Sequence, residues 1–248
     1  KQSGFFAEAE ALINAEGTAA KGWHKQADLG LFGRLHESSL RDADRARIFV
    51  RARGDSAEKY DEHGWDWALR YSMRDETYVS RLTGEVATDD LGNEIGDRYD
   101  SGRADLMLQW RFPGRKFGRF SVEATAADRN YLEDYQQFGL ERLDYYEYAV
   151  GPGYELDSRD SNLSVKLLYE KRIYDDRRVD DAAGAPVAGT DLEYEYYGVE
   201  ARYRHRFTRR SALELTGGYD LREDNGVGYA DRTRWNVGME WTQRFRDD

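Results

Sequence analysis

The 248-residue chain contains no cysteine, only 3 prolines and only 4 histidines. Without cysteine, the protein cannot form a disulfide framework, a thiolate zinc site or a cysteine nucleophile. A basic surplus is missing too, because 37 Lys and Arg against 48 Asp and Glu give a net charge of −11. This acidic balance argues against nucleic-acid binding, so we expect no nucleic-acid partner.

Long apolar segments are also missing. No run of apolar residues approaches the roughly 18 that a membrane-spanning helix needs, and no amphipathic pattern extends over three helical turns. No signal peptide is recognisable, so we expect a chain that is either cytosolic or already processed. Aromatic residues, by contrast, are abundant, with 18 Tyr, 10 Phe and 6 Trp in a chain of which 34% is charged. Such a composition is expected of a barrel whose apolar residues face outward.

Apolar residues recur at every second position from one end of the chain to the other. A clear example is Trp65, Trp67, Leu69, Tyr71 and Met73. Because successive side chains of a strand point to opposite faces, each such row predicts a two-faced β-strand. The rows predict about twelve strands in a single domain spanning residues 1–248, a normal density for a meander barrel. They occupy residues 5–13, 27–35, 48–52, 65–73, 78–86, 104–112, 120–126, 146–156, 163–173, 197–207, 213–221 and 235–245.

The connections between these rows alternate between short and long. The links that precede residues 120, 163 and 213 are short turns, whereas residues 86–102 and 128–144 form long polar loops. A third long polar loop is predicted at 175–191. This alternation is typical of outer-membrane barrels, with short periplasmic turns and long extracellular loops. With the strand at 78–86 included, both ends of the strand path are expected at the short-turn rim.

The charged rows are expected to face the inside of the barrel. Twelve strands enclose a lumen too wide for one layer of side chains to fill, whereas lipid can cover an apolar outer face. The sequence therefore predicts a closed antiparallel up-and-down transmembrane β-barrel; a soluble all-β protein is the alternative. Aromatic residues near strand ends predict an interfacial girdle. We assign these aromatics to the lipid interface: Trp65, Trp67, Trp110, Trp235, Trp241 and Phe245.

Arginine dominates the lumenal rows of several neighbouring strands, while glutamates are frequent at 119–125 and 147–155. A column of arginines selects anions in pores, and the planar guanidinium binds carboxylates through two hydrogen bonds. The alternative is that arginines and carboxylates only neutralise one another. We assign these residues to the lumen and to anion selectivity: Arg47, Arg51, Arg53, Arg70, Arg74, Arg103, Arg111, Arg202, Arg204 and Arg206.

An enzyme of the outer membrane is the hypothesis from another class, and we do not expect one. Such a hydrolase needs a serine, a histidine and an acid that converge near the lipid-facing rim. None of the histidines lies next to a GxSxG-like segment. His205 belongs to an apolar row near a strand end, where an amphipathic ring is common at a membrane interface. The acidic segment 89–97 does not have the spacing of an EF-hand loop. We therefore expect no catalytic residue, no metal and no cofactor.

The final row, WNVGMEWTQRF (235–245), resembles the closing strand of Gram-negative outer-membrane proteins, which alternates apolar residues and ends on an aromatic residue. Here residues 246–248 follow that aromatic, which departs from the pattern. The resemblance implies a location in the outer membrane, contacts with its lipid and lipopolysaccharide, and recognition by the barrel-assembly machinery.

A narrower resemblance is to the twelve-strand porins specific for acidic oligosaccharides, the oligogalacturonate-type family. The segments RDADRARIFVRARGD (41–55) and DRTRWNVGMEW (231–241) are similar to strands of that family. This resemblance implies passive uptake of anionic oligosaccharides past lumenal arginines. Barrels of exopolysaccharide export complexes look similar, so a structural, salt-bridged lumen with partner subunits remains an alternative. An outer-membrane lipid-modifying enzyme is the second alternative.

Overall fold

The structure is a computed structural model, and it describes residues 6–19, 23–36, 45–56, 61–76, 85–89, 91–114, 118–132, 143–228 and 230–243. Within these ranges the protein is all-β, and eleven strands form one sheet in the order of the sequence. No helix in the described part of the chain is long and apolar enough to cross a membrane. The strands are β1 Phe6–Ala19, β2 Trp23–His36, β3 Arg45–Ser56, β4 Gly64–Glu76, β5 Ser101–Arg111, β6 Arg119–Tyr131, β7 Tyr145–Asp157, β8 Ser161–Asp180, β9 Pro186–Arg206, β10 Ser211–Asp224 and β11 Arg232–Gln243.

Each strand pairs antiparallel with its neighbours in sequence, which confirms the predicted up-and-down order. Every predicted apolar row except 78–86 overlaps a strand of the sheet. Most of that segment lies outside the described residues, but β4 pairs directly with β5, so no strand lies between them in the sheet. As a result, β1 and β11 both begin at the end of the sheet that carries the long connections. The expectation that β1 begins at the short-turn rim is wrong for the described sheet.

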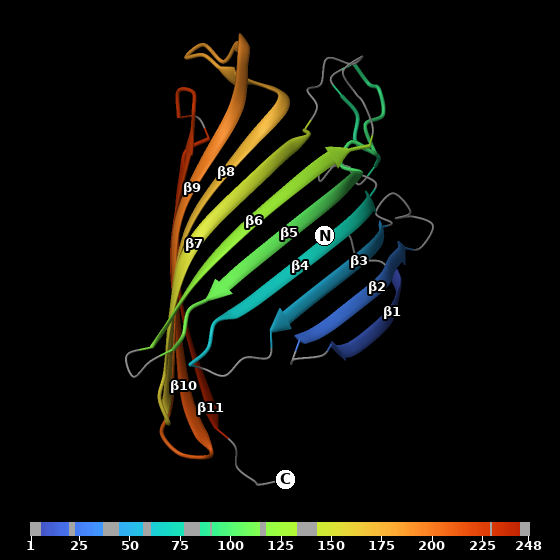
Figure 1. Cartoon of the computed structure of the whole chain (residues 1–248). Helices are drawn as coiled ribbons and strands as arrows, with labels where there is room; N and C mark the ends of the chain where they lie inside the picture. Colours follow the sequence, from blue (N-terminus) through green and yellow to red (C-terminus); the bar gives the residue numbers. More distant parts are fainter. Residues whose placement is uncertain are drawn as a thin grey trace.

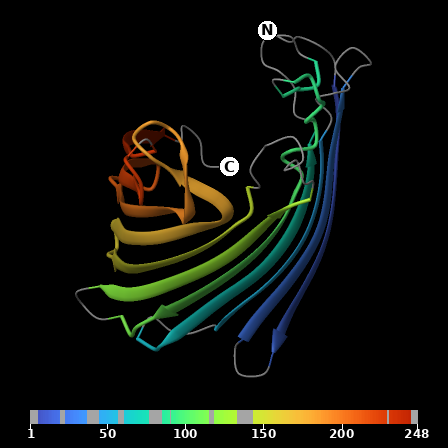
Figure 2. The same cartoon turned by 90° about the horizontal axis from the view of Figure 1, so that it is seen from above.

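The sheet is strongly twisted and curled (Figure 1). Seen from above, it forms an open trough, with β1 to β4 on one side and β9 to β11 curling inward on the other (Figure 2). In the described residues no hydrogen-bonded ladder joins β1 to β11, so the sheet keeps two edges. The predicted antiparallel meander is thus confirmed, whereas closure into a barrel is not shown.

The predicted alternation of connections is confirmed at several positions. The connection from β7 to β8 is a tight turn at residues 158–160, and that from β9 to β10 is a tight turn at 207–210. At the opposite rim, residues 77–100 and 132–144 separate successive strands. We call these two ends of the sheet the short-turn rim and the long-loop rim.

The third predicted long loop, 175–191, is instead a β-hairpin that extends β8 and β9 beyond the rim (Figure 1). Its turn is held by Asp181, whose carboxylate accepts hydrogen bonds from the backbone N–H groups of Ala183 and Ala185 at 2.8 and 3.0 Å. These amide donors lower the pKa of Asp181. Gly184 takes a positive φ of 79°, which a side chain would disfavour. The polar composition therefore reflects an ordered turn.

The main buried apolar cluster in the described chain is small and lies near the long-loop rim. It consists of Tyr145, Tyr174, Val179, Leu192 and Tyr194, which come from β7, β8 and β9. Most of the other large apolar side chains remain exposed. Among the side chains that the structure describes, neither face of the sheet carries a continuous buried apolar core.

Candidate functional site on the two faces of the sheet

The two faces of the sheet differ in both chemistry and exposure. On β5, Leu106 and Leu108 are 42% and 47% exposed, whereas Asp105, Met107 and Gln109 are half-buried. The same alternation runs along β6. We call the row that contains Leu106 the apolar face and the row that contains Asp105 the polar face. The exposed apolar face continues from β2 to β11 through Leu29, Leu31, Ile48, Val50, Leu69, Leu106, Leu108, Val122, Val150, Leu167, Leu215 and Val237.

The polar face is the concave face of the curled sheet. Arg103 of β5 reaches Glu147 of β7, two strands away. In the register Glu147 lies beside the small Ala127 of β6, whereas Arg103 lies beside Arg129, so the contact runs diagonally across β6. Such a contact across an intervening strand, about 10 Å from backbone to backbone, is favoured on the inner side of a curved sheet, where side chains converge. Curvature therefore shelters the charges and spreads the apolar residues apart.

The predicted interfacial aromatics lie on the apolar face wherever the structure describes them. Trp65 stacks on Trp110 at the short-turn rim, with ring centroids 5.0 Å apart and an interplanar angle of 4°. Trp67 lies against Gly54, where an added Cβ would meet the indole ring at 2.4 Å. On β11, Trp241 lies toward the short-turn rim and Trp235 toward the long-loop rim. Phe245 lies outside the described residues.

Four of the predicted lumenal arginines are ion-paired on the polar face. The pair between Arg51 and Asp28 joins β3 to β2, and Asp28 is almost completely buried. Arg111 contacts Asp66 at 2.7 Å, and Arg202 contacts Glu214 at 2.8 Å. The fourth, Arg103, belongs to a larger network. For these four residues the neutralised alternative describes the geometry better than a free basic wall does.

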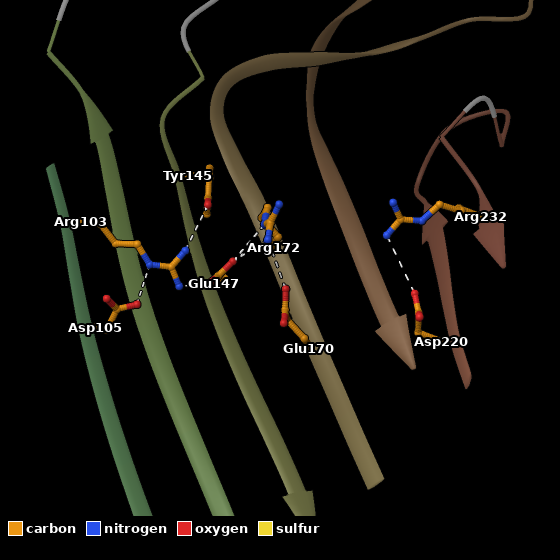
Figure 3. Close-up of polar contacts among 8 residues, drawn as sticks. All are labelled: Arg103, Asp105, Tyr145, Glu147, Glu170, Arg172, Asp220 and Arg232. Atoms are coloured by element: carbon orange, nitrogen blue, oxygen red, sulfur yellow. Dashed lines mark hydrogen bonds and ion pairs between the residues drawn. The ribbon is translucent and has the colours of Figure 1, made fainter. Parts of the chain in front are cut away.

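That network crosses four strands, from β5 to β8 (Figure 3). Arg103 pairs with Asp105 on its own strand and with Glu147 on β7. Glu147 also accepts from Arg172 at 2.8 Å, and Arg172 lies 3.4 Å from Glu170. Glu147 of the glutamate-containing strand β7 therefore forms an ion pair with Arg103 of the arginine-rich strand β5, two strands away in the same sheet.

The other predicted arginines have different surroundings. Arg53 donates to the amide oxygen of Gln26, a neutral partner. Arg70 forms no ion pair with a described residue; the carboxylate of its register partner Asp105 is taken by Arg103. Arg74 has at least one polar partner. The side chain of Arg47 lies outside the described part of the structure.

Arg204 and Arg206 form no ion pair with any carboxylate in the described residues, and both are exposed. Arg204 lies opposite Glu214 in the register, but the carboxylate of Glu214 is held by Arg202. The two arginines border a groove of about 550 Å³ at the short-turn rim, formed by β7, β8 and β9. They also border a smaller hollow of about 230 Å³ that includes Arg209 and Arg210. The lining of the larger groove also includes the carboxylates of Glu155, Asp157 and Asp160, so this rim gathers charges of both signs, with four arginines against three acids.

The sequence did not indicate the cluster of tyrosines and arginines at the long-loop end of the polar face. The Arg172 guanidinium lies 4.4 Å from the ring centroid of Tyr145, and Arg222 lies 4.7 Å from that of Tyr194. Cations bind aromatic rings in this geometry. Tyr145 and Tyr194 come from different strands, so only the pairing of β7, β8 and β9 brings them together.

Of the acidic segment 89–97, the structure describes residue 89 and residues 91–97, and Leu91 and Asn93 are held by hydrogen bonds to Asp89. The Asp89 carboxylate accepts from the side-chain amide of Asn93 at 2.8 Å and from the backbone N–H groups of Leu91 and Asn93. The bond from the Asn93 side chain is the main reason that the pKa of Asp89 is lowered. Among the described residues no group of three His, Asp or Glu side chains could hold a metal ion.

Two residues that enzymes use do meet on the apolar face. The Ser161 hydroxyl oxygen lies 2.7 Å from Nδ1 of His205, and no carboxylate in the described chain contacts that histidine. The sequence placed His205 correctly in the apolar row but did not pair it with Ser161. The two are 44 positions apart and become neighbours through the register of β8 and β9.

No protein-family model matches this chain, and the search of curated proteins gave no match either. The two faces of the sheet and their charges therefore carry the functional conclusion alone.

Proposed function

We propose that this chain forms a β-barrel in the outer membrane of a Gram-negative bacterium and that its polar face lines a channel for small anionic solutes, with acidic oligosaccharides as the solute class. The observation that carries this proposal is the exposed apolar face, which runs across β2 to β11 opposite a sheltered, charged face. Monomeric soluble proteins rarely expose an apolar surface of this extent, whereas lipid covers it at no cost.

Closure of the sheet follows from this placement. Within a bilayer no water satisfies the backbone N–H and C=O groups of a free edge, so β1 and β11 must each find a partner. The proposed orientation has the short turns in the periplasm and the long loops outside, next to lipopolysaccharide. The alternating β11 would serve as the strand that the barrel-assembly machinery recognises.

The charge distribution supports anion passage mainly at one end of the polar face. The network around Arg103 and Glu147 is largely neutralised, so it contributes rigidity more than selectivity. Arg204 and Arg206 carry charge without a described carboxylate partner and border the groove at the short-turn rim. Arginine there can attract carboxylates or phosphates from the solution. Of the arginines predicted to set anion selectivity, we therefore propose that Arg204 and Arg206 at the short-turn rim contribute most.

We expect that the double substitution Arg204→Ser and Arg206→Ser shifts the permeability ratio toward cations by more than about twofold, because it removes two positive charges from a groove that also carries Glu155, Asp157 and Asp160. The measurement is the reversal potential of the refolded protein in a planar bilayer under a salt gradient. Arg178→Ser is the matched control, since Arg178 lies in the β8–β9 hairpin and is paired with Asp191. An unchanged reversal potential in the double variant would refute the proposed role of this rim.

A second candidate function is supported by the same network of ion pairs. A lumen neutralised across four strands suits a structural barrel in an export complex, which conducts only with its partner subunits. The bilayer experiment separates the two functions. A channel conducts as the refolded chain alone, whereas an export barrel gives no steps of conductance without its partners.

A further inference from the structure

Ser161 and His205 form a close pair on the apolar face at the short-turn rim. Ser161 is the first residue of β8, and its Cα partner in the register is His205, near the end of β9. The 2.7 Å between the serine oxygen and Nδ1 is the contact that a nucleophile and its general base need. Both side chains are half-buried, so the pair is sheltered but not sealed.

A third group completes a reactive arrangement. The hydroxyl oxygen of Tyr203 lies 3.4 Å from the hydroxyl oxygen of Ser161. A tyrosine O–H at this position can donate to the oxygen of a carbonyl group that the serine attacks, because that oxygen gains negative charge in the transition state. Ser161, Tyr203 and His205 therefore supply a nucleophile, an electrophilic donor and a base.

The surroundings indicate which substrates could reach the pair. His205 packs edge-on against Phe207 at 4.6 Å between ring centroids, and Phe207 packs against Trp241 at 5.4 Å. Aromatic residues at the end of an apolar face lie where the acyl chains of a bilayer meet the headgroups. The ester bonds of glycerophospholipids lie at that same depth. This step rests on the proposed placement of the apolar face in lipid.

We propose that Ser161 and His205 are the catalytic residues of an ester hydrolase that acts on glycerophospholipids of the leaflet next to the short-turn rim. The Ser161 hydroxyl attacks the ester carbonyl carbon, and its proton moves to Nδ1 of His205. The tetrahedral oxyanion accepts a hydrogen bond from Tyr203. The bond from carbon to the alcohol oxygen then breaks, and His205 returns the proton to that oxygen. Water, activated by His205, releases the fatty acid and restores the serine.

The pair lacks the acid that holds the histidine in most hydrolases, because no described carboxylate contacts His205. Without it, the histidine is a weaker base, and slow turnover is expected. Covalent trapping of the serine is therefore a better readout than steady-state turnover. The opposing explanation is that the hydrogen bond only anchors the tight turn before β8, in which case Ser161 has no special reactivity.

The test uses the refolded full chain in detergent micelles and a fluorescent alkyl fluorophosphonate, which reacts with activated serines. Labelling is expected at Ser161, with loss of the label in Ser161→Ala and at least a hundredfold slower labelling in His205→Ala. Two controls should label normally: Ser121→Ala on the polar face, and His63→Ala, which removes another rim histidine that contacts Trp110. Absence of labelling, or equal labelling in Ser161→Ala, would overturn the proposal.

Hydrolysis assays then separate the activity from the membrane placement. Release of fatty acid from phosphatidylethanolamine vesicles that depends on Ser161 supports the whole proposal. If only a water-soluble short-chain ester is hydrolysed, the residues are catalytic but the lipid substrate is wrong. Because the pair lies on the face opposite the pore, conductance of Ser161→Ala should equal that of the unchanged protein. If the unchanged protein does not conduct, the proposed channel function fails, but the labelling of Ser161 still tests the proposed hydrolase.

Discussion

Leu106→Arg is expected to prevent stable insertion of the protein into a bilayer, whereas Met107→Arg, one residue away, is expected to be tolerated. Leu106 lies at the middle of β5 on the apolar face, between Leu69 and Ala126 of the neighbouring strands. An arginine at the lipid-facing midplane of a barrel costs about 2–4 kcal/mol. Met107 lies on the polar face beside Asp105 and Gln109, and under the proposed placement water would reach a new charge there.

The measurement is folding into phospholipid vesicles, followed by urea titration and by the shift in gel mobility of unheated protein. The Leu106 variant should lose most of its folded fraction, and the Met107 variant should keep it. Equal tolerance of both variants, or equal loss, would contradict the assignment of the two faces.

Glu147→Gln is expected to be the most damaging single change on the polar face. Its side chain is only 11% exposed, and its carboxylate lies between two arginines, Arg103 of β5 and Arg172 of β8. Removing its charge leaves two guanidinium groups close together without their shared partner. Breaking a buried ion pair in this way typically costs about 3–5 kcal/mol, and water in the lumen places the expected loss near the lower end.

The same variant should also change selectivity. The substitution removes one negative charge from the polar face and leaves Asp105 and Glu170 as the partners of Arg103 and Arg172. It should therefore shift the reversal potential toward anions, the opposite direction from the Arg204 and Arg206 double variant. For the free energy of unfolding, Glu155→Gln on the same strand is the matched control, because Glu155 is exposed and forms no ion pair with the described residues. If Glu147→Gln lowers the free energy of unfolding by no more than Glu155→Gln does, the network is not a structural element.

The alternation of side chains was predictable because it depends only on the local geometry of a strand. The row from Trp65 to Met73 identified β4, and the same rule assigned Leu106 and Asp105 to opposite faces before any pairing was known. The meander order followed from the short turns. Whether the number of strands is odd or even could not be predicted in this way. It depended on segment 78–86, whose weak alternation does not decide whether it forms a strand.

The partners of individual arginines could not be predicted from the sequence. Arg103 meets Glu147, 44 positions away, in a diagonal contact across β6 that depends on the pairing of β5, β6 and β7. Arg70 of β4 lies opposite Asp105 of β5 in the register. It nevertheless forms no ion pair with the described residues, since the Asp105 carboxylate is bound by Arg103. A count of charges for each strand cannot distinguish these two cases. The Ser161–His205 contact was hidden for the same reason, because the register of β8 and β9 sets it.

The absence of cysteine makes one measurement decisive for the central claim that the apolar face lies in lipid and the polar face in water. Single cysteines introduced at positions 105 to 109 of β5, in separate variants, carry the only thiol in each protein. In vesicles, a water-soluble, membrane-impermeant maleimide should label the cysteines at positions 105, 107 and 109 but not those at 106 and 108. In a second set of samples, a fluorophore is attached to each cysteine before the protein is folded into vesicles. Quenchers attached to lipid should then reduce the fluorescence at 106 and 108. The central claim would be contradicted if the maleimide labelled 106 and 108 as strongly as 107, or if 105, 107 and 109 were the positions that it failed to label.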